Sequence, residues 1–208
     1  MNYDILYTFI IATSLLAITP GPDNIFVLLQ SVVNGKKYGF ATIAGLMSGC
    51  IIHTTLVALG MSALIQQSDQ LFFTIKILGA GYLFFLAFKV YIANSKIDLH
   101  SDTIPRKKPL QLFKQGFIMN VLNPKVSIFF LAFFPAFLFS NTLSTVAQFY
   151  ILGCIFICVS FFFFGLIAVL ADYISQSIRE IKSVGMFLKW IQIIVFSAIG
   201  VFILLSEK

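Results

Sequence analysis

The chain contains six apolar stretches that are each long enough to cross a lipid bilayer. They cover residues 5–32, 38–65, 71–94, 113–139, 145–170 and 185–205. A helix needs about 20 predominantly apolar residues to span the hydrocarbon core. Only 11% of the 208 residues are charged, whereas soluble domains average about 25%. The sequence therefore predicts an all-α membrane protein with six transmembrane helices, forming a single domain over residues 1–208.

Basic residues fall on one side of this predicted topology. Lys and Arg follow the first helix and flank the connections between the third and fourth and the fifth and sixth helices. The opposite side offers only Lys208, with Lys76 about one turn inside the third helix. Because cytoplasmic loops carry the excess of Lys and Arg, we expect both termini to lie outside. Topology thus accounts for the net charge of +6, and no nucleic-acid partner is needed.

The longest polar stretch, about 95–112, divides the chain into two halves of three helices. We expect a first repeat over about 1–94, a cytoplasmic linker, and a second repeat over about 113–208. An odd number of helices in each half means that the second half enters the membrane from the opposite face. Homologous halves would therefore form an inverted repeat, an arrangement that many secondary transporters share.

Each half begins with a helix that is interrupted by proline. The interruptions contain Pro20, Gly21 and Pro22 in TPGPDN and Pro124 in NPK. Proline inside a helix removes a backbone hydrogen bond and clashes with the preceding turn. The freed backbone groups are tolerated at membrane depth only against protein or a water-filled cavity. Interruptions at corresponding positions of two halves therefore predict a transport site near the middle of the membrane.

The two interruptions carry opposite charges, Asp23 in the first and Lys125 in the second. An ionised side chain at the bilayer centre costs ~2.5–3.5 kcal/mol on insertion scales, so each needs a partner or a ligand. Either the two pair and fix how the halves dock, or they line a cavity and bind a ligand with both charges. A zwitterion fits the second alternative, with its carboxylate near Lys125 and a helix N-terminus. Its ammonium group would lie on Asp23, assisted by Asn24 or Asn123.

The second apolar stretch carries small residues on one helix face. Ala41, Gly45, Gly49 and His53 recur every four residues, and GLMSG matches the GxxxG pattern of closely packed membrane helices. We therefore predict Gly45 and Gly49 to be helix-packing residues. His53 is either a hydrogen-bonded structural residue or a proton carrier, because histidine titrates near neutral pH. Asp23 is the competing proton carrier.

The sequence gives little support to catalysis or metal chemistry. Cys50, Cys154 and Cys158 lie within apolar stretches and form no CxxC motif, so neither a disulfide framework nor a thiol redox pair is indicated. No nucleophile–base arrangement and no cluster of metal ligands is present in the sequence. We expect a protein that is not an enzyme and has no cofactor and no metal site. A divalent-cation exporter and a membrane scaffold or redox protein remain alternative functions.

Four motifs follow one another from the first helix into the fourth. They are TPGPDNIFVLL, the stretch with Gly45, Gly49 and His53, KILGAGYLFFLAFK, and GFIMNVLNPKVSIFFLAFFP. In this order they resemble the LysE/RhtB family of amino-acid exporters. The resemblance implies proton-coupled efflux of lysine, threonine, homoserine, leucine or similar amino acids across the bacterial inner membrane, and a homodimer. It also implies that the residues characteristic of the family include Asp23, Asn123, Pro124 and Lys125.

Overall fold

The structure is a computed structural model that describes residues 2–19, 21–62, 69–93, 107–171, 173–174 and 184–205. Pro20, most of the predicted linker and the connection at 175–183 lie outside the described residues. All regular secondary structure within the described ranges is helical, which confirms the predicted all-α class.

The helices follow the six apolar stretches. They are α1 (Tyr3–Ile18), α2 (Pro22–Asn34), α3 (Lys36–Leu56) with the π-helical turn η1 (Val57–Met61), α5 (Asp69–Ile92), α6 (Pro109–Val121), α7 (Pro124–Phe133) with the 3-10 turn η2 (Phe134–Phe137), α8 (Thr145–Val169) and α10 (Val184–Leu205). Four described segments are long and apolar enough to cross a membrane, and two bent helix pairs raise this number to six if each pair is one span. The fold therefore agrees with a membrane protein of four to six spans.

Both predicted interruptions are bends. The pair α1 and α2 is bent by 58°, and the pair α6 and α7 is bent by 53°. Pro22 and Pro124 lie in the first turns of α2 and α7, where the missing proline N–H is not needed for the helix. Asn123 caps α7, because its Oδ1 accepts a hydrogen bond from the Lys125 backbone N–H at 3.0 Å. The sequence of each bend thus ends one helix and starts the next.

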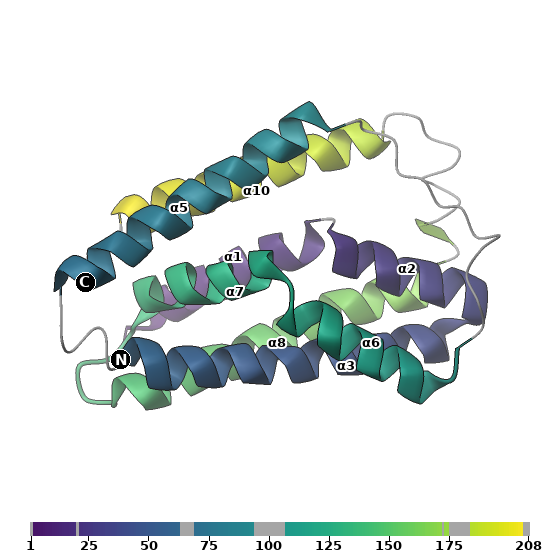
Figure 1. Cartoon of the computed structure of the whole chain (residues 1–208), viewed down its shortest axis with the longest axis horizontal. Helices are drawn as coiled ribbons and strands as arrows, with labels where there is room; N and C mark the ends of the chain where they lie inside the picture. Colours follow the sequence, from purple (N-terminus) through teal and green to yellow (C-terminus); the bar gives the residue numbers. More distant parts are fainter. Residues whose placement is uncertain are drawn as a thin grey trace.

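The helices are arranged in two groups (Figure 1). Helices α1, α2, α3, α6, α7 and α8 lie together, while α5 and α10 pack against each other and contact the first group mainly through α7. Helix α1 begins and α10 ends at the same end of the molecule (Figure 1). Both bends belong to the larger group and lie part of the way along the molecule, away from either end (Figure 1).

The contact between α3 and α6 depends on glycine. A Cβ atom on Gly45 would collide with the Phe113 carbonyl of α6, and one on Gly49 would lie 2.5 Å from Asn120 Oδ1. In the reverse direction, a Cβ atom on Gly116 would lie 2.5 Å from the Thr42 carbonyl. The backbones of these two helices are in direct contact. The predicted packing residues Gly45 and Gly49 therefore allow α6 to lie close to α3.

Phenylalanine side chains of α7, η2 and α1 pack against one another. Phe129 stacks on Phe133 with ring centroids 4.2 Å apart, and Phe130 stacks on Phe134 at 4.3 Å. Phe9 of α1 lies 5.3 Å from Phe134 in an edge-to-face contact. All five side chains are fully buried. This packing fixes α7 against α1, and with it the position of the second bend.

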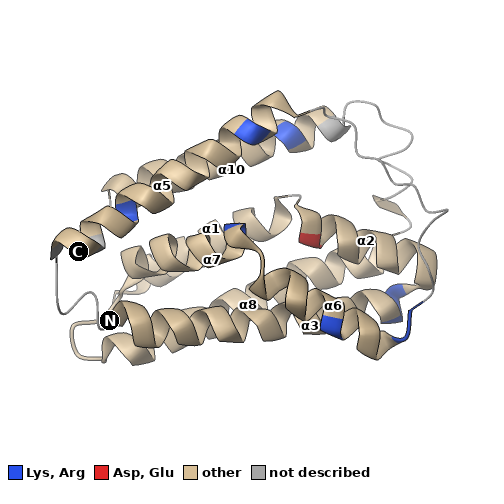
Figure 2. Ribbon diagram, in the orientation of Figure 1, with Lys and Arg blue, Asp and Glu red and all other residues tan. Residues whose placement is uncertain are grey.

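Most of the described Lys and Arg residues lie toward the end of the molecule opposite to the start of α1 (Figure 2). Lys36 begins α3, Lys108 precedes α6, and Lys89 lies in the last turn of α5. If each bent pair is one span, successive connections alternate between the two ends of the molecule, and every second connection lies at the basic end. The orientation of this end in the membrane stays a prediction from the positive-inside rule.

The basic end is predicted to face the cytoplasm. A cysteine introduced at the exposed Asn141, in the connection before α8, should react with a membrane-impermeant maleimide added to intact cells. A cysteine at the exposed Lys37 should react only after the cells are opened. The protein without an introduced cysteine gives the background labelling. The reverse pattern would show that the termini face the cytoplasm.

The glycine contact is predicted to limit stability. Gly45→Leu should lower the thermal unfolding midpoint of the detergent-solubilised protein, because overpacking costs ~1–3 kcal/mol. Gly81→Leu is the matched control, since a Cβ atom on Gly81 of α5 meets no atom within 4 Å. Equal midpoints for the two variants would contradict the backbone contact between α3 and α6.

Candidate functional site

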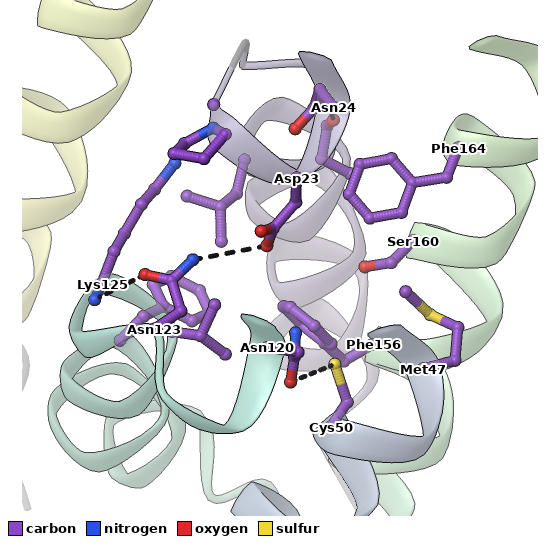
Figure 3. A pocket seen from close by; sticks show the side chains of 16 residues that line it. Asp23, Asn24, Met47, Cys50, Asn120, Asn123, Lys125, Phe156, Ser160 and Phe164 are labelled. Atoms are coloured by element: carbon purple, nitrogen blue, oxygen red, sulfur yellow. Dashed lines mark hydrogen bonds between the residues drawn. The ribbon is translucent and has the colours of Figure 1, made fainter. Parts of the chain in front are cut away.

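The two bends contact each other although they are about 100 residues apart in the sequence. Asn123 Nδ2 donates a hydrogen bond to Asp23 Oδ2 at 3.4 Å. The Lys125 side chain extends from the second bend toward the first (Figure 3). Its Nζ lies 3.3 Å from the position that a Cβ atom on Gly21 would occupy. The structure thus brings together the predicted residues of both interruptions.

A cavity of about 60 Å³ lies between the bends and is lined by residues of six helices. Its polar lining consists of Asp23, Asn24, Asn120, Asn123, Lys125 and Ser160. The remaining lining is mostly apolar and includes Phe129 of α7 and Phe156 and Phe164 of α8. This combination of a mainly apolar wall with a few converging polar groups is typical of a small-molecule site.

Asp23 is only partly satisfied within this cavity. Its Oδ2 accepts the long hydrogen bond from Asn123, and its Oδ1 is buried without any hydrogen-bond partner. Leaving a buried acceptor unpaired costs ~1–3 kcal/mol, and more when the group is charged. Any donor that reaches Oδ1 would therefore bind favourably, whether it is a proton, a water molecule or an ammonium group.

Lys125 and Asp23 do not form a direct ion pair in this conformation. Among the described residues, Lys125 donates no hydrogen bond to Asp23. The two charges are still close enough to interact electrostatically. Lys125 Nζ lies 4.7 Å from the ring centroid of Phe196 on α10, within the range of a cation–π contact. The two charges thus lie separately beside one cavity. The two roles that the sequence analysis considered for them, a structural pair and a ligand site, stay predictions.

The N-terminus of α2 adds positive potential beside Lys125. Gly21 precedes this helix and provides no side-chain cap, so backbone N–H groups of the first turn stay available. The helix dipole places partial positive charge at the same end. A carboxylate is the natural ligand for such a terminus, and here the Lys125 ammonium group reinforces it.

Asn24 supports the first bend from within α2. Its Nδ2 donates a 2.7 Å hydrogen bond to the Ala17 carbonyl, which lies near the C-terminal end of α1. The proline-made break removes the backbone donors that would serve such carbonyls. Asn24 therefore has a structural contact in addition to its place in the cavity lining, where the sequence predicted only a ligand contact.

His53 lies near the second bend but is not part of the cavity lining. Its Nε2 is 3.1 Å from the Asn120 carbonyl at the end of α6, and its ring packs 5.5 Å from that of Phe130. The side chain is buried. This position corresponds to the hydrogen-bonded structural alternative that the sequence analysis considered.

The sequence analysis missed two polar lining residues, Asn120 and Ser160, and the lining residue Cys50. Asn120 packs on Gly49, and its Oδ1 accepts a weak hydrogen bond from Cys50 Sγ at 3.7 Å. Ser160 lines the cavity from α8. Asn120 and Ser160 are isolated polar residues within apolar helices, and this signal could have identified them. Cys50 gives no comparable signal, because cysteine is often an ordinary packing residue.

Comparisons with known proteins agree with the resemblance of the motifs. The family model described as LysE type translocator matches residues 14–207. The homoserine/homoserine lactone efflux protein of Salmonella typhimurium is 32% identical over 182 residues, which cover 88% of this chain and 87% of the relative. The leucine efflux protein of Salmonella choleraesuis is 29% identical over 188 residues, which cover 89% and 86%.

An uncharacterised membrane protein of Bacillus subtilis is 30% identical over 192 residues, which cover 88% of this chain and 91% of the relative. No solved structure matches the chain. Because the family model covers nearly the whole sequence, the chain belongs to the LysE type translocators.

Proposed function

We propose that the protein exports amino acids across the bacterial inner membrane in exchange for protons. The family assignment and the efflux proteins among its relatives support transport of small amino-acid-type molecules. The cavity between the two bends is the proposed site, because its charged groups match the two charges of an amino acid.

The observation that carries this proposal is the pair of separated opposite charges around one cavity. The buried Oδ1 of Asp23 lacks a donor, and the α-ammonium group of an amino acid would supply one. Lys125 Nζ and the uncapped N-terminus of α2 lie beside Gly21 and would hold the α-carboxylate. A ligand with a single charge would leave one of these groups without a partner.

The size of the cavity indicates a contracted conformation. An engineered apolar cavity of ~150 Å³ takes up benzene, whereas this cavity measures about 60 Å³. A complete amino acid therefore requires the lining helices to separate. Hinge motions use a few residues at the ends of elements, and the two bends supply such residues on both sides of the cavity. Opening at one bend and then at the other would expose the site alternately.

Asp23 is the proposed point of proton coupling. One unpartnered oxygen can accept a proton or the substrate ammonium group, but not both together. A proton that arrives from outside would therefore release the amino acid, and loss of the proton inside would prepare the site for the next one. His53 is the weaker candidate, since its Nε2 is already engaged with the Asn120 carbonyl.

Export of divalent cations receives less support from the site. Calcium and magnesium prefer several oxygen ligands, including carboxylates. No group of three or more His, Cys, Asp or Glu side chains that could hold a metal occurs among the residues that the structure describes. In addition, Lys125 lines the same cavity and would repel a cation.

Asp23→Asn is predicted to abolish proton-driven uptake of amino acids into inside-out vesicles, which corresponds to export from the cell, while the protein still inserts and folds. The substitution keeps the size of the side chain and its contact with Asn123 but removes its negative charge and its titration. Asp4→Asn, in the exposed first turn of α1, is the matched control and should leave efflux unchanged.

The double variant Asp23→Asn, Lys125→Gln distinguishes transport chemistry from simple charge balance. If Asp23 only neutralises Lys125, the single variant leaves a cation without compensation, and the double variant should recover both stability and transport. Near-normal efflux by the double variant would reject the proposed role of the two charges. A stable but inactive double variant is the expected result.

A further inference from the structure

A second cavity of about 230 Å³ adjoins the polar cavity at Asn24. It is partly open to the surface of the molecule, because its lining residues Ile18, Leu166 and Leu170 are 40–47% exposed. Asn24 lines both cavities, and among the residues that the structure describes it is the only polar one that lines the second. The other described lining side chains, of which Leu28 of α2 and Leu166 of α8 are examples, are aliphatic or aromatic. The second cavity therefore offers apolar surface with a single amide at one side.

The two cavities are neighbours along both α1 and α8. Ala17 lines the polar cavity, and the adjacent Ile18 lines the apolar one. On α8, Phe164 faces the polar cavity and Phe163 the apolar one. Asn24 lines both cavities, and its Nδ2 donates a hydrogen bond to the Ala17 carbonyl. A shift of α2 at the first bend would move the Asn24 side chain and change the boundary between the two cavities.

The two cavities have complementary chemistry. The polar cavity holds both charges but has no room for a large side chain, since its volume is about 60 Å³. The apolar cavity, at about 230 Å³, exceeds the ~150 Å³ that accommodates benzene. A charged side chain placed there would lose its hydration without gaining a partner, which is costly. An isobutyl, thioether or phenyl group would be buried favourably.

We propose that the apolar cavity receives the side chain of the exported amino acid, so that the protein exports aliphatic and aromatic amino acids in preference to basic and acidic ones. This inference rests on the proposed amino-acid export and adds the substrate class to it. The amino acid would lie with its α-carbon beside Asn24, its charged groups between Asp23 and Lys125, and its side chain against Leu28 and Leu166.

A lipid acyl chain is the competing occupant, because the apolar cavity belongs to a membrane protein. The amide of Asn24 favours the amino acid, since an acyl chain has no use for a polar group in its binding surface. The position of the apolar cavity next to the cavity that contains both charges favours the amino acid as well. A substitution that fills the apolar cavity should have different effects for these two occupants.

The test compares the export of leucine, alanine and lysine from proteoliposomes that are loaded with equal concentrations and energised by a proton gradient. The native protein should export leucine faster than lysine. Leu166→Trp fills the apolar cavity and should lower the ratio of leucine to alanine export about tenfold, the scale of discrimination by small steric changes in apolar pockets. Alanine does not reach the apolar cavity, so its export in the same variant shows that the variant is folded.

Val169→Trp is the matched control, because Val169 lies three residues further along α8, is 57% exposed and does not line the cavity. It should leave the ratio of leucine to alanine export unchanged. Ile25→Phe, which fills the cavity from α2, provides a second variant with the expected loss of leucine export.

The possible results separate the inference from the function on which it rests. Preferred export of lysine, or an unchanged leucine-to-alanine ratio in both filled variants, would overturn the apolar side-chain site and leave amino-acid export standing. An unchanged ratio together with fewer co-purifying lipids in Leu166→Trp would assign the cavity to an acyl chain. If the native protein exported no amino acid, both the proposed function and this inference would be rejected.

Discussion

The structure depends on hydrogen-bond partners for the backbone N–H and C=O groups that the two helix bends leave unpaired, because little water can reach such groups in a membrane protein. Each bend frees backbone groups that would be costly in contact with lipid. Asn24 donates to the Ala17 carbonyl in the first bend, and Asn123 accepts from the Lys125 N–H in the second. Each bend is therefore stabilised on the side that faces the other. The hydrogen bond from Asn123 to Asp23 joins the two bends beside the polar cavity.

Two tightly packed contacts outside the polar cavity fix the helices that line it. The glycine contact between α3 and α6 brings two backbones together near Asn120, and the stacked phenylalanines of α7 fix the second bend against α1. These contacts are apolar or depend on small residues, so they can act within lipid, where burial of apolar surface gives no advantage over contact with acyl chains. The polar residues are then free to line the cavity between the bends.

The arrangement of the charges connects the packing of α7 to the proposed transport site. Asn123 serves both sides of the site, because its Oδ1 caps α7 while its Nδ2 contacts Asp23. A displacement of α7 would therefore change the surroundings of Asp23 directly. An amide that couples helix position to a carboxylate is well suited to a carrier, since ligand binding and helix movement must affect each other in alternating access.

The sequence by itself determined the helical spans, the two bends and the opposite charges at them, because hydrophobic length and proline act locally. It did not determine which atoms meet. That Asp23 contacts Asn123 rather than Lys125, and that Asn24 ties α2 to Ala17, was decided only by the tertiary structure. Asn120 likewise joined the site only through the crossing of α3 and α6. Contacts between residues far apart in sequence depend on how the helices pack, and no local pattern encodes that geometry.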